Sequence, residues 1–387
     1  MPRSSPPDGT PLLIAAVSGR ALAAAARRAG YVPLVADFFA DEDTRHIAHA
    51  CHKLDGLKHG FQWRTLGPAL EALAEAAPSP LLGVMYGAGF EDRTNLLARI
   101  AERWPLLGNE PSVVERVKDP RLFFAELSRL GVPHPRTVTD PSAASDGWLA
   151  KRQGGAGGSH VVARQALARG KEAGRVYFQE RIEGRPVSAL FAAAGDRACV
   201  LGFSEQWAAP TPHSKWRYGG AAQPAELSTE LTARLTRSAE QVAATFGLKG
   251  LGSADFLIDG EEAWLLEINP RPGATLDIFD SEAVPLLRIH LAAVLERRLP
   301  DGPLRLSEAS AAAIVYATEP MTVSQSMVWP EWTADRPIGG DCIDRNRPIC
   351  TVSARARTKV EAKQLVSERI STILAACAGQ EGGTEWT

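Results

Sequence analysis

Three oxygen-bearing side chains in the second half of the sequence have the types and spacing of a divalent-cation site. Asp255 lies in one apolar run, and Glu267 and Asn269 lie late in the next, across the turn Asp259-Gly260. The turn predicts a β-hairpin, whose antiparallel pairing would bring Asp255 close to Glu267. Side chains alternate along a strand, so Glu267 and Asn269 share one face. Such oxygens suit Mg²⁺ or Mn²⁺; the alternative is a polar strand end with solvated charges.

Two basic residues stand beside features that suit phosphate binding. Arg271 lies two residues beyond Asn269 on the same face, where a guanidinium could hold a phosphoryl or carboxylate group. Lys151 ends a predicted strand and precedes a glycine-rich loop, in which backbone N–H groups can face an anion. The glycines of this loop are Gly154, Gly155, Gly157 and Gly158. The loop has neither the Walker nor the dinucleotide-binding spacing, and a flexible hairpin is the alternative interpretation.

The elements that position these residues begin with alternating strands and helices in the first 110 residues. Apolar runs and helical periodicity predict strands at 12–17, 32–36 and 81–86, with helices at 19–29 and 68–77. This order favours a doubly wound parallel sheet, where ligands lie beyond the carboxyl ends of strands. The polar residues at those ends are candidates for substrate binding: Ser18, Arg20, Asp37 and Glu91. An arginine suits a carboxylate and Glu91 suits an amine; ordinary surface loops are the alternative.

The rest of the chain predicts two further units. A helix at about 119–130 ends at Gly131, a β-rich block runs from 148 to 203, and a long helix at 225–246 precedes the hairpin. A Pro-, Gly- and charge-rich stretch at 299–306 marks a boundary before a small unit with a helix near 360–376. We therefore expect a mixed α/β and α+β fold with domains at 1–110, 111–305 and 306–387.

Composition excludes several classes of protein. The formal net charge of −2 provides no field to attract nucleic acid or an anionic membrane, so neither is an expected partner. The five cysteines are scattered without a C-x-x-C pair, which favours free thiols in a reducing compartment. The early apolar run at 12–17 is too short to span a bilayer, and we expect a cytoplasmic location.

These motifs resemble, in residues and in order, those of a known protein superfamily. The run L-E-I-N-P-R-P-G at 266–273, preceded by S-A-D-F at 253–256, resembles the metal-binding end of the ATP-grasp superfamily. That family has an upstream lysine, then a second lysine with a glycine-rich loop, then an adenine-binding hinge. Here these would be Lys118, Lys151 and the segment 178–184. The resemblance runs from about residue 10 to 375 and implies an N-terminal pre-ATP-grasp domain, a central ATP-grasp domain with two α+β subdomains, and a small C-terminal unit.

The resemblance also implies cofactors and roles. ATP and Mg²⁺ (or Mn²⁺) would be bound, with Lys118 on the α-phosphate side and Lys151 with its glycine loop at the β- and γ-phosphates. Arg271, Lys151 and Glu267 would be the catalytic residues. Many members place an acid for the ribose just after the hinge, where this chain has Arg185-Pro186. The implied hinge contacts are therefore Gln179, Glu180, Ile182 and, as the ribose acid, Glu183.

A further sequence motif resembles that of one branch of this superfamily. The run K-W-R-Y-G-G at 215–220 resembles that of predicted ATP-dependent carboxylate–amine ligases, and it adds Arg217 and Tyr218 as substrate residues across the cleft. The implied reaction phosphorylates a small-molecule carboxylate to an acyl phosphate, which an amine then attacks. Some members of that branch accompany genes for one-carbon-carrier cofactors such as tetrahydromethanopterin and methanofuran. A carboxylase that acts through carboxyphosphate, or a nucleotide-binding protein without turnover, is the alternative, and a homodimer is compatible with each.

Overall fold

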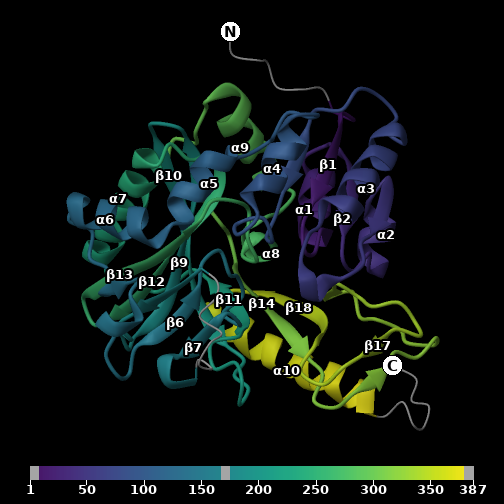
Figure 1. Ribbon diagram of the computed structural model, residues 1–387. Coiled ribbons are helices and arrows are strands. Elements are labelled where there is room, and N and C mark those ends of the chain that lie inside the picture. Colours follow the sequence, from purple (N-terminus) through teal and green to yellow (C-terminus); the bar gives the residue numbers. More distant parts are fainter. Residues whose placement is uncertain (1–7, 167–174, 379–387) are drawn as a thin grey trace.

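The computed structural model describes residues 8–166 and 175–378. Its N-terminal part is a four-stranded parallel sheet with the order β3-β2-β1-β4, flanked by helices, shown in purple and blue in Figure 1. The strands are β1 (Pro11–Ala15), β2 (Val32–Asp37), β3 (Ala50–Lys53) and β4 (Val84–Tyr86). The helices are α1 (Arg20–Arg28), α2 (Glu42–Ile47), η1 (Leu57–His59), α3 (Trp63–Glu75) and α4 (Thr94–Ala101). The predicted parallel sheet is confirmed.

Two consecutive helices connect this sheet to the rest of the chain. They are α5 (Pro111–Lys118) and α6 (Pro120–Leu130). The side chain of Asp119 accepts hydrogen bonds from the first turn of α6, and Gly131 ends that helix with a positive φ of 67°. Lys118 is therefore held at the C-terminus of α5, immediately before a capped helix start.

The glycine-rich loop belongs to a small antiparallel sheet with the order β5-β8-β6-β7. Its strands are β5 (Thr137–Val138), β6 (Leu149–Arg152), β7 (Val161–Ala163) and β8 (Val176–Gln179), with short helices η2 (Pro141–Ala143) and η3 (Arg164–Ala166). Ala144, Trp148, Ala150 and Phe178 form its own small core. The loop is thus the β6–β7 connection of a compact subdomain.

An eight-stranded sheet forms the centre of the molecule, in the order β13-β12-β9-β10-β11-β14-β18-β16. Its first five strands are β9 (Arg185–Ala194), β10 (Ala198–Ala208), β11 (Tyr218–Gln223), β12 (Lys249–Asp259) and β13 (Glu262–Asn269). Helix α7 (Thr229–Thr245) packs against β9 and β10. The prediction that this helix begins at 225 was wrong, because Ser228 accepts a hydrogen bond from Leu231 N and caps the first turn there.

Three of the five C-terminal strands extend the same sheet, because β14 pairs with β11, whereas β15 and β17 form a separate two-stranded sheet. The remaining strands are β14 (Ala309–Tyr316), β15 (Met321–Thr322), β16 (Thr333–Ala334), β17 (Cys342–Ile343) and β18 (Pro348–Ala356). The remaining helices are α8 (Leu276–Phe279), α9 (Leu286–Leu291), the π-helix η4 (Ala292–Glu296) and α10 (Lys359–Ala378), the last of which covers β14 and β18 (Figure 1). The predicted mixed α/β and α+β fold is confirmed, whereas the domain boundaries stay predictions. No described helix is long and apolar enough to cross a membrane.

Candidate functional site

The β12–β13 hairpin brings the three predicted metal ligands together. Asp255 lies opposite Glu267 and Ser253 lies opposite Asn269, so the predicted antiparallel pairing is confirmed. The amide nitrogen of Asn269 donates to Asp255 Oδ2 at 2.9 Å. From α5, Lys118 Nζ donates to Glu267 Oε2 at 3.2 Å and to Asn269 Oδ1 at 3.1 Å. Oxygens of Glu267 and Asn269 therefore converge on one cationic position, which the lysine ammonium fills.

The chemistry of these donors fits a hard divalent cation. Two carboxylates and an amide oxygen are ligands that Mg²⁺ accepts together with water and phosphate. Ser188 on β9, to which no sequence motif pointed, donates to Asp255 Oδ1 at 2.6 Å and orients that carboxylate. Within the described ranges, no group of three or more His, Cys, Asp or Glu side chains could hold a metal. A cation here would therefore need the amide of Asn269 and ligands from outside the protein.

The two acids of the hairpin have opposite electrostatic environments. Burial alone would raise the pKa of Glu267, but the positive charges of Lys118, His160 and Lys151 lower it. Burial, followed by the negative charge of Glu267, raises the pKa of Asp255. Glu267 is therefore the carboxylate that carries its charge most firmly, whereas Asp255 keeps its proton up to a higher pH.

A buried hydrogen bond holds Lys151 at segment 178–184, the predicted adenine-binding hinge. Its Nζ donates to Gln179 Oε1 at 2.6 Å, and Gln179 Nε2 donates to Thr137 Oγ1 at 3.1 Å. Burial lowers the pKa of Lys151. The backbone N–H of Glu180 donates to Arg136 O at 2.8 Å. In this structure the side chain of Gln179 and the N–H of Glu180, both predicted nucleotide contacts, are thus bound to protein groups.

The other predicted hinge residues lie nearer the surface. Ile182 is half-buried, and Glu183 is exposed and pairs with Arg181 at 2.6 Å. Nothing else in the described residues holds the carboxylate of Glu183 in place. Its role as the ribose acid stays a prediction.

The glycine-rich loop lies against two other segments at distances that only glycine permits. Gly158 has a φ of +73°, and a Cβ at this position would overlap the carbonyl oxygen of Trp216. A Cβ on Gly154 would lie 2.6 Å from the backbone nitrogen of Asp92. Gly157 O accepts a hydrogen bond from Tyr218 N at 3.0 Å. The loop therefore connects the N-terminal strand ends with the start of β11.

The space between the glycine-rich loop and the hairpin is small. A cavity of about 20 Å³ remains there, with Lys118, Gly155, His160 and Glu267 in its lining. This is room for about one water molecule. His160 was not selected from the sequence, since a histidine after a glycine-rich loop matches no motif; burial lowers its pKa.

A second cavity, of about 270 Å³, lies at the carboxyl ends of the N-terminal strands. Four of the predicted site residues are in its lining, namely Ser18, Arg20, Tyr218 and Arg271. Two acids that no sequence signal pointed to also line it, Asp277 from α8 and Asp335 from the segment after β16. Asp335 has a φ of 57°, in the left-handed region that is uncommon outside glycine.

Arg20 forms the centre of a buried ionic group with these two acids. Its NH1 and NH2 donate to Asp277 Oδ1 and Oδ2, both at 2.6 Å. Its Nε and NH2 donate to Asp335 Oδ1 at 3.0 Å and to Asp335 Oδ2 at 2.9 Å. Burial alone would lower the pKa of Arg20, but the attraction of both carboxylates raises it. Protein carboxylates thus use four of the about five N–H donors of this guanidinium.

Glu91 and Arg271 form a second buried pair beside this cavity. Arg271 Nε donates to Glu91 Oε1 at 2.8 Å, and Glu91 Oε2 accepts from the backbone of Gly89 and Phe90 at 2.8 and 3.0 Å. Arg271 lines the cavity and Glu91 does not. Glu91 therefore supports Arg271 in this structure, and its predicted contact with an amine stays a prediction.

Asp37 and Arg217, also predicted to bind substrate, lie outside the cavity lining. Asp37 is fully buried and accepts hydrogen bonds from the backbone of Gly19 at 2.7 Å and of Ala40 at 2.7 Å. Arg217 stacks on the ring of Tyr316, with 3.6 Å between its guanidinium carbon and the ring centroid. Both side chains stabilise loops around the cavity, and any direct contact with a ligand stays a prediction.

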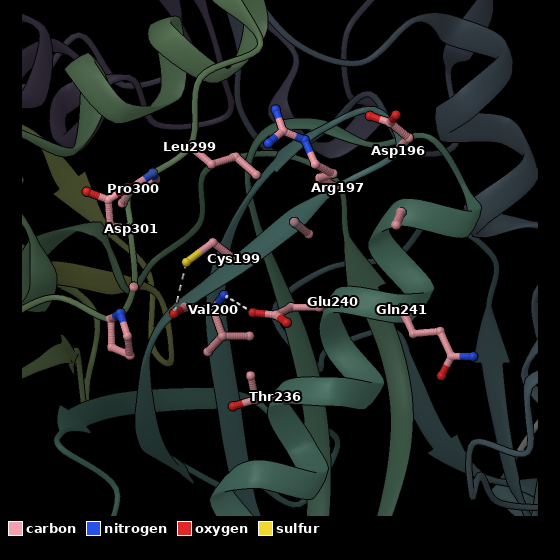
Figure 2. A pocket seen from close by; sticks show the side chains of 14 residues that line it. Asp196, Arg197, Cys199, Val200, Thr236, Glu240, Gln241, Leu299, Pro300 and Asp301 are labelled. Carbon is pink, nitrogen blue, oxygen red and sulfur yellow. Dashed lines mark hydrogen bonds between the residues drawn. The ribbon is translucent and has the colours of Figure 1, made fainter.

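A hollow larger than these two cavities lies elsewhere. It is an open depression of about 600 Å³ between β10, α7 and the segment 299–303 (Figure 2). Glu240 extends from α7 toward β10, where its carboxylate accepts from Val200 N at 2.9 Å. None of the predicted site residues lines this depression. Size alone therefore does not identify the functional site.

Known proteins place these motifs in a family. Residues 117–275 match the model of the ATP-grasp domain. A carbamoyl phosphate synthase large chain from Rubrobacter xylanophilus is 27% identical over 276 residues, which are 65% of this chain and 26% of that protein. This chain therefore aligns with only about a quarter of that relative. A formate-dependent phosphoribosylglycinamide formyltransferase from Yersinia enterocolitica is 25% identical over 328 residues, 77% of each protein.

Solved structures share the fold over nearly the whole chain. N5-carboxyaminoimidazole synthetase from Staphylococcus aureus in complex with ADP has a TM-score of 0.68 at 15% identity, covering 94% of this chain and 97% of its own. A complex of Campylobacter jejuni biotin carboxylase with β,γ-ATP has a TM-score of 0.72 at 16% identity, covering 91% and 89%. The matched region includes Lys118, Lys151, the glycine-rich loop and the hairpin ligands. This chain therefore contains an ATP-grasp domain, at residues 117–275.

Proposed function

We propose that this protein is an ATP- and Mg²⁺-dependent ligase that activates a substrate carboxylate as an acyl phosphate and joins it to an amine. The observation that carries the proposal is the convergence of Glu267 and Asn269 on the ammonium of Lys118, beside Asp255. Glycines of the loop that follows Lys151 line the same small cavity. Arg271, two residues beyond Asn269, lines the larger cavity. The segment 269–271 therefore joins the two parts of the proposed site. Asn269 lies among the proposed phosphate- and metal-binding groups, and Arg271 lies at the cavity that is large enough for a substrate.

Different residues would bind different parts of the nucleotide. Lys118 takes the α-phosphate side, and Lys151 with the N–H groups of the glycine-rich loop takes the β- and γ-phosphates. Asp255, Glu267 and Asn269 would hold Mg²⁺, which would screen the charge that develops on the phosphates. Binding requires Lys118 to move from the carboxylate to the nucleotide. Because about 20 Å³ cannot admit a triphosphate, the subdomain of β5–β8 has to move away from β13 for ATP to enter.

The chemistry follows from this arrangement. A carboxylate oxygen of the substrate attacks the γ-phosphorus, the bond to the β-phosphate oxygen breaks, and ADP leaves. The amine loses one proton to solvent and attacks the acyl carbon in its neutral form; a second proton leaves its nitrogen with the departing phosphate, which leaves an amide. Arg271 steadies the acyl phosphate and the oxyanion, and Glu91 holds the guanidinium in place. A closed glycine-rich loop excludes water that would hydrolyse the acyl phosphate.

The test is a screen for Mg²⁺-dependent ADP release with pairs of carboxylic acids and amines, amino acids included. We expect release that requires both partners and is lost in Glu267→Gln. ADP release that needs bicarbonate and no amine would instead indicate a carboxylase that acts through carboxyphosphate. Tight ATP binding without ADP release under any condition would indicate a binding protein.

The identities of the acid and the amine are not part of the proposal. The relatives reported above give no support to a role in the biosynthesis of one-carbon-carrier cofactors, and we do not propose one. The expected homodimer and the expected cytoplasmic location stay predictions.

A further inference from the structure

The charges around the strand-end cavity favour a positively charged ligand. Arg20 is shared by two carboxylates, Asp277 and Asp335, and the second guanidinium of the cavity, that of Arg271, is paired with Glu91. These five groups carry two positive and three negative charges, which leaves a buried excess of one negative charge. An anionic ligand without a positive group would meet repulsion here, and a cation would be attracted.

The two acids that hold Arg20 differ in how fully their oxygens are used. Asp335 accepts from Arg20 with both oxygens and also from Ser18 Oγ at 3.3 Å and Thr351 Oγ1 at 2.6 Å. Among the described residues, Asp277 accepts side-chain hydrogen bonds from Arg20 alone, one at each oxygen. An ionised carboxylate has about four acceptor positions. Asp277 therefore keeps acceptor capacity on the cavity side, whereas the capacity of Asp335 is used.

Most of the remaining cavity wall is apolar, beside the hydroxyl groups of Ser18, Tyr218 and Thr351. Leu22, Ala88, Leu276, Ala312 and Ile314 belong to it. Such a wall suits an aliphatic or aromatic body and gives no partner to a second charge. Arg271, on the segment that carries the proposed catalytic groups, lines the same cavity and would lie toward the reacting end of a bound substrate.

We propose that the cavity selects a co-substrate that carries a protonated amine on a small apolar body, with the ammonium held by Asp277. Arg20 and Asp335 are positioning residues: Arg20 fixes the Asp277 carboxylate by two parallel hydrogen bonds, and Asp335 holds the Arg20 guanidinium in place. The inference rests on the proposed ligase function only in treating this cavity as the substrate site. It adds to that function the chemical class of one substrate.

The test measures binding without nucleotide, by calorimetry at pH 7. The probes are isobutylamine, 3-methylbutylamine and phenethylamine, each paired with the analogue in which hydroxyl or hydrogen replaces the amino group. We expect the wild-type protein to bind at least one amine about tenfold or more tightly than its analogue, since charge-assisted hydrogen bonds carry the difference. In Asp277→Asn this ratio should fall to near one. In Asp301→Asn, which removes an exposed carboxylate outside the cavity, it should be unchanged.

Three results would overturn the inference: an equal ratio in wild type and Asp277→Asn, a preference for the deaminated analogues, or no binding of any amine at millimolar concentration while ATP still binds. Asp277→Ser serves as the second variant if Asp277→Asn does not fold, and the wild-type ratio is informative alone. Failure of the ligase proposal is recognised separately, as absence of acid- and amine-dependent ADP release. Amine selectivity in binding would survive that failure.

Discussion

Arg271 and Glu91 are joined by a hydrogen bond of 2.8 Å from Nε to Oε1, between the end of β13 and the loop after β4. Their side chains are only 10% and 3% exposed. Burial alone would raise the pKa of Glu91, but the charges of Arg271 and Lys118 lower it, so the glutamate stays ionised. The proposed catalytic arginine is therefore fixed by a residue of the N-terminal part of the chain, in the loop after β4.

Breaking this pair should cost stability in a non-additive way. Removing one partner leaves a buried charge uncompensated, so Glu91→Gln and Arg271→Gln should each lower the free energy of unfolding by about 3–5 kcal/mol. The double variant should lose clearly less than the sum of the two. Urea unfolding of the four proteins measures the coupling, and strictly additive losses would show that the pair is not coupled in solution.

Glu267→Ala should abolish turnover with little loss of stability. Glu267 contributes a charged oxygen to the proposed nucleotide site, and loss of such a contact costs on the order of 10²–10³ in rate. The fold should tolerate the change because Lys118 keeps its bond to Asn269. The matched control is Glu262→Ala, an exposed glutamate on the same strand. ADP release and melting temperature are measured together; near wild-type ADP release in Glu267→Ala would refute the assignment.

Two glycines of the same loop offer a matched comparison. Gly157 and Gly158 both have a positive φ, +68° and +73°. A Cβ on Gly157 meets no atom within 4 Å, whereas a Cβ on Gly158 would overlap Trp216 O. Gly157→Ala therefore adds backbone strain only, and Gly158→Ala also displaces the loop. We expect Gly158→Ala to raise the KM for ATP several-fold more than Gly157→Ala, and an equal effect would mean that the loop does not close in this way during turnover.

The hairpin and its ligands could be predicted from the sequence because the information is local. A two-residue turn and the alternation of strand side chains set the register that places Asp255 opposite Glu267. The strand β3 was missed, since its four residues are half-buried or exposed and show no apolar run. Local sequence patterns thus predicted the long elements but did not predict this short edge strand.

The acids of the strand-end cavity could not be predicted, because their partner is distant in the chain. Asp277 and Asp335 meet Arg20 across separations of 257 and 315 residues. The same holds for Glu91 and Arg271, which are 180 residues apart. Taken alone, each of these residues looks like an ordinary charged surface residue. Because the sequence does not show the acidic partners of Arg20, we expected this arginine to bind a substrate carboxylate. Only the tertiary structure shows that protein acids already neutralise it.

A pH dependence of stability should originate at Asp41. This residue caps α2, and burial, then the nearby charge of Asp335, raises its pKa to about 7. A folded-state pKa above the unfolded value means that the native protein binds more protons, so stability falls as pH rises from about 4 to 7. Asp41→Asn should remove this pH-dependent contribution to the free energy of unfolding. Between pH 5 and 8, the stability of wild type relative to Asp41→Asn should fall by roughly 2–4 kcal/mol, since one pKa unit corresponds to about 1.4 kcal/mol.

Unfolding by urea at pH 5, 6, 7 and 8 measures this difference. Other groups titrate equally in both proteins and cancel in the comparison. A wild-type advantage that stays constant or grows toward pH 8 would contradict the predicted direction.

The central claim is that Asp255, Glu267 and Asn269 bind a divalent ion together with a nucleotide, and Mn²⁺ in place of Mg²⁺ tests it most directly. The signal of free Mn²⁺ is followed by electron paramagnetic resonance in the presence of ADP and the protein. For wild type and Glu262→Ala we expect the free signal to fall well below that with ADP alone, and for Glu267→Ala to remain near it. Equal Mn²⁺ binding by wild type and Glu267→Ala would contradict the account.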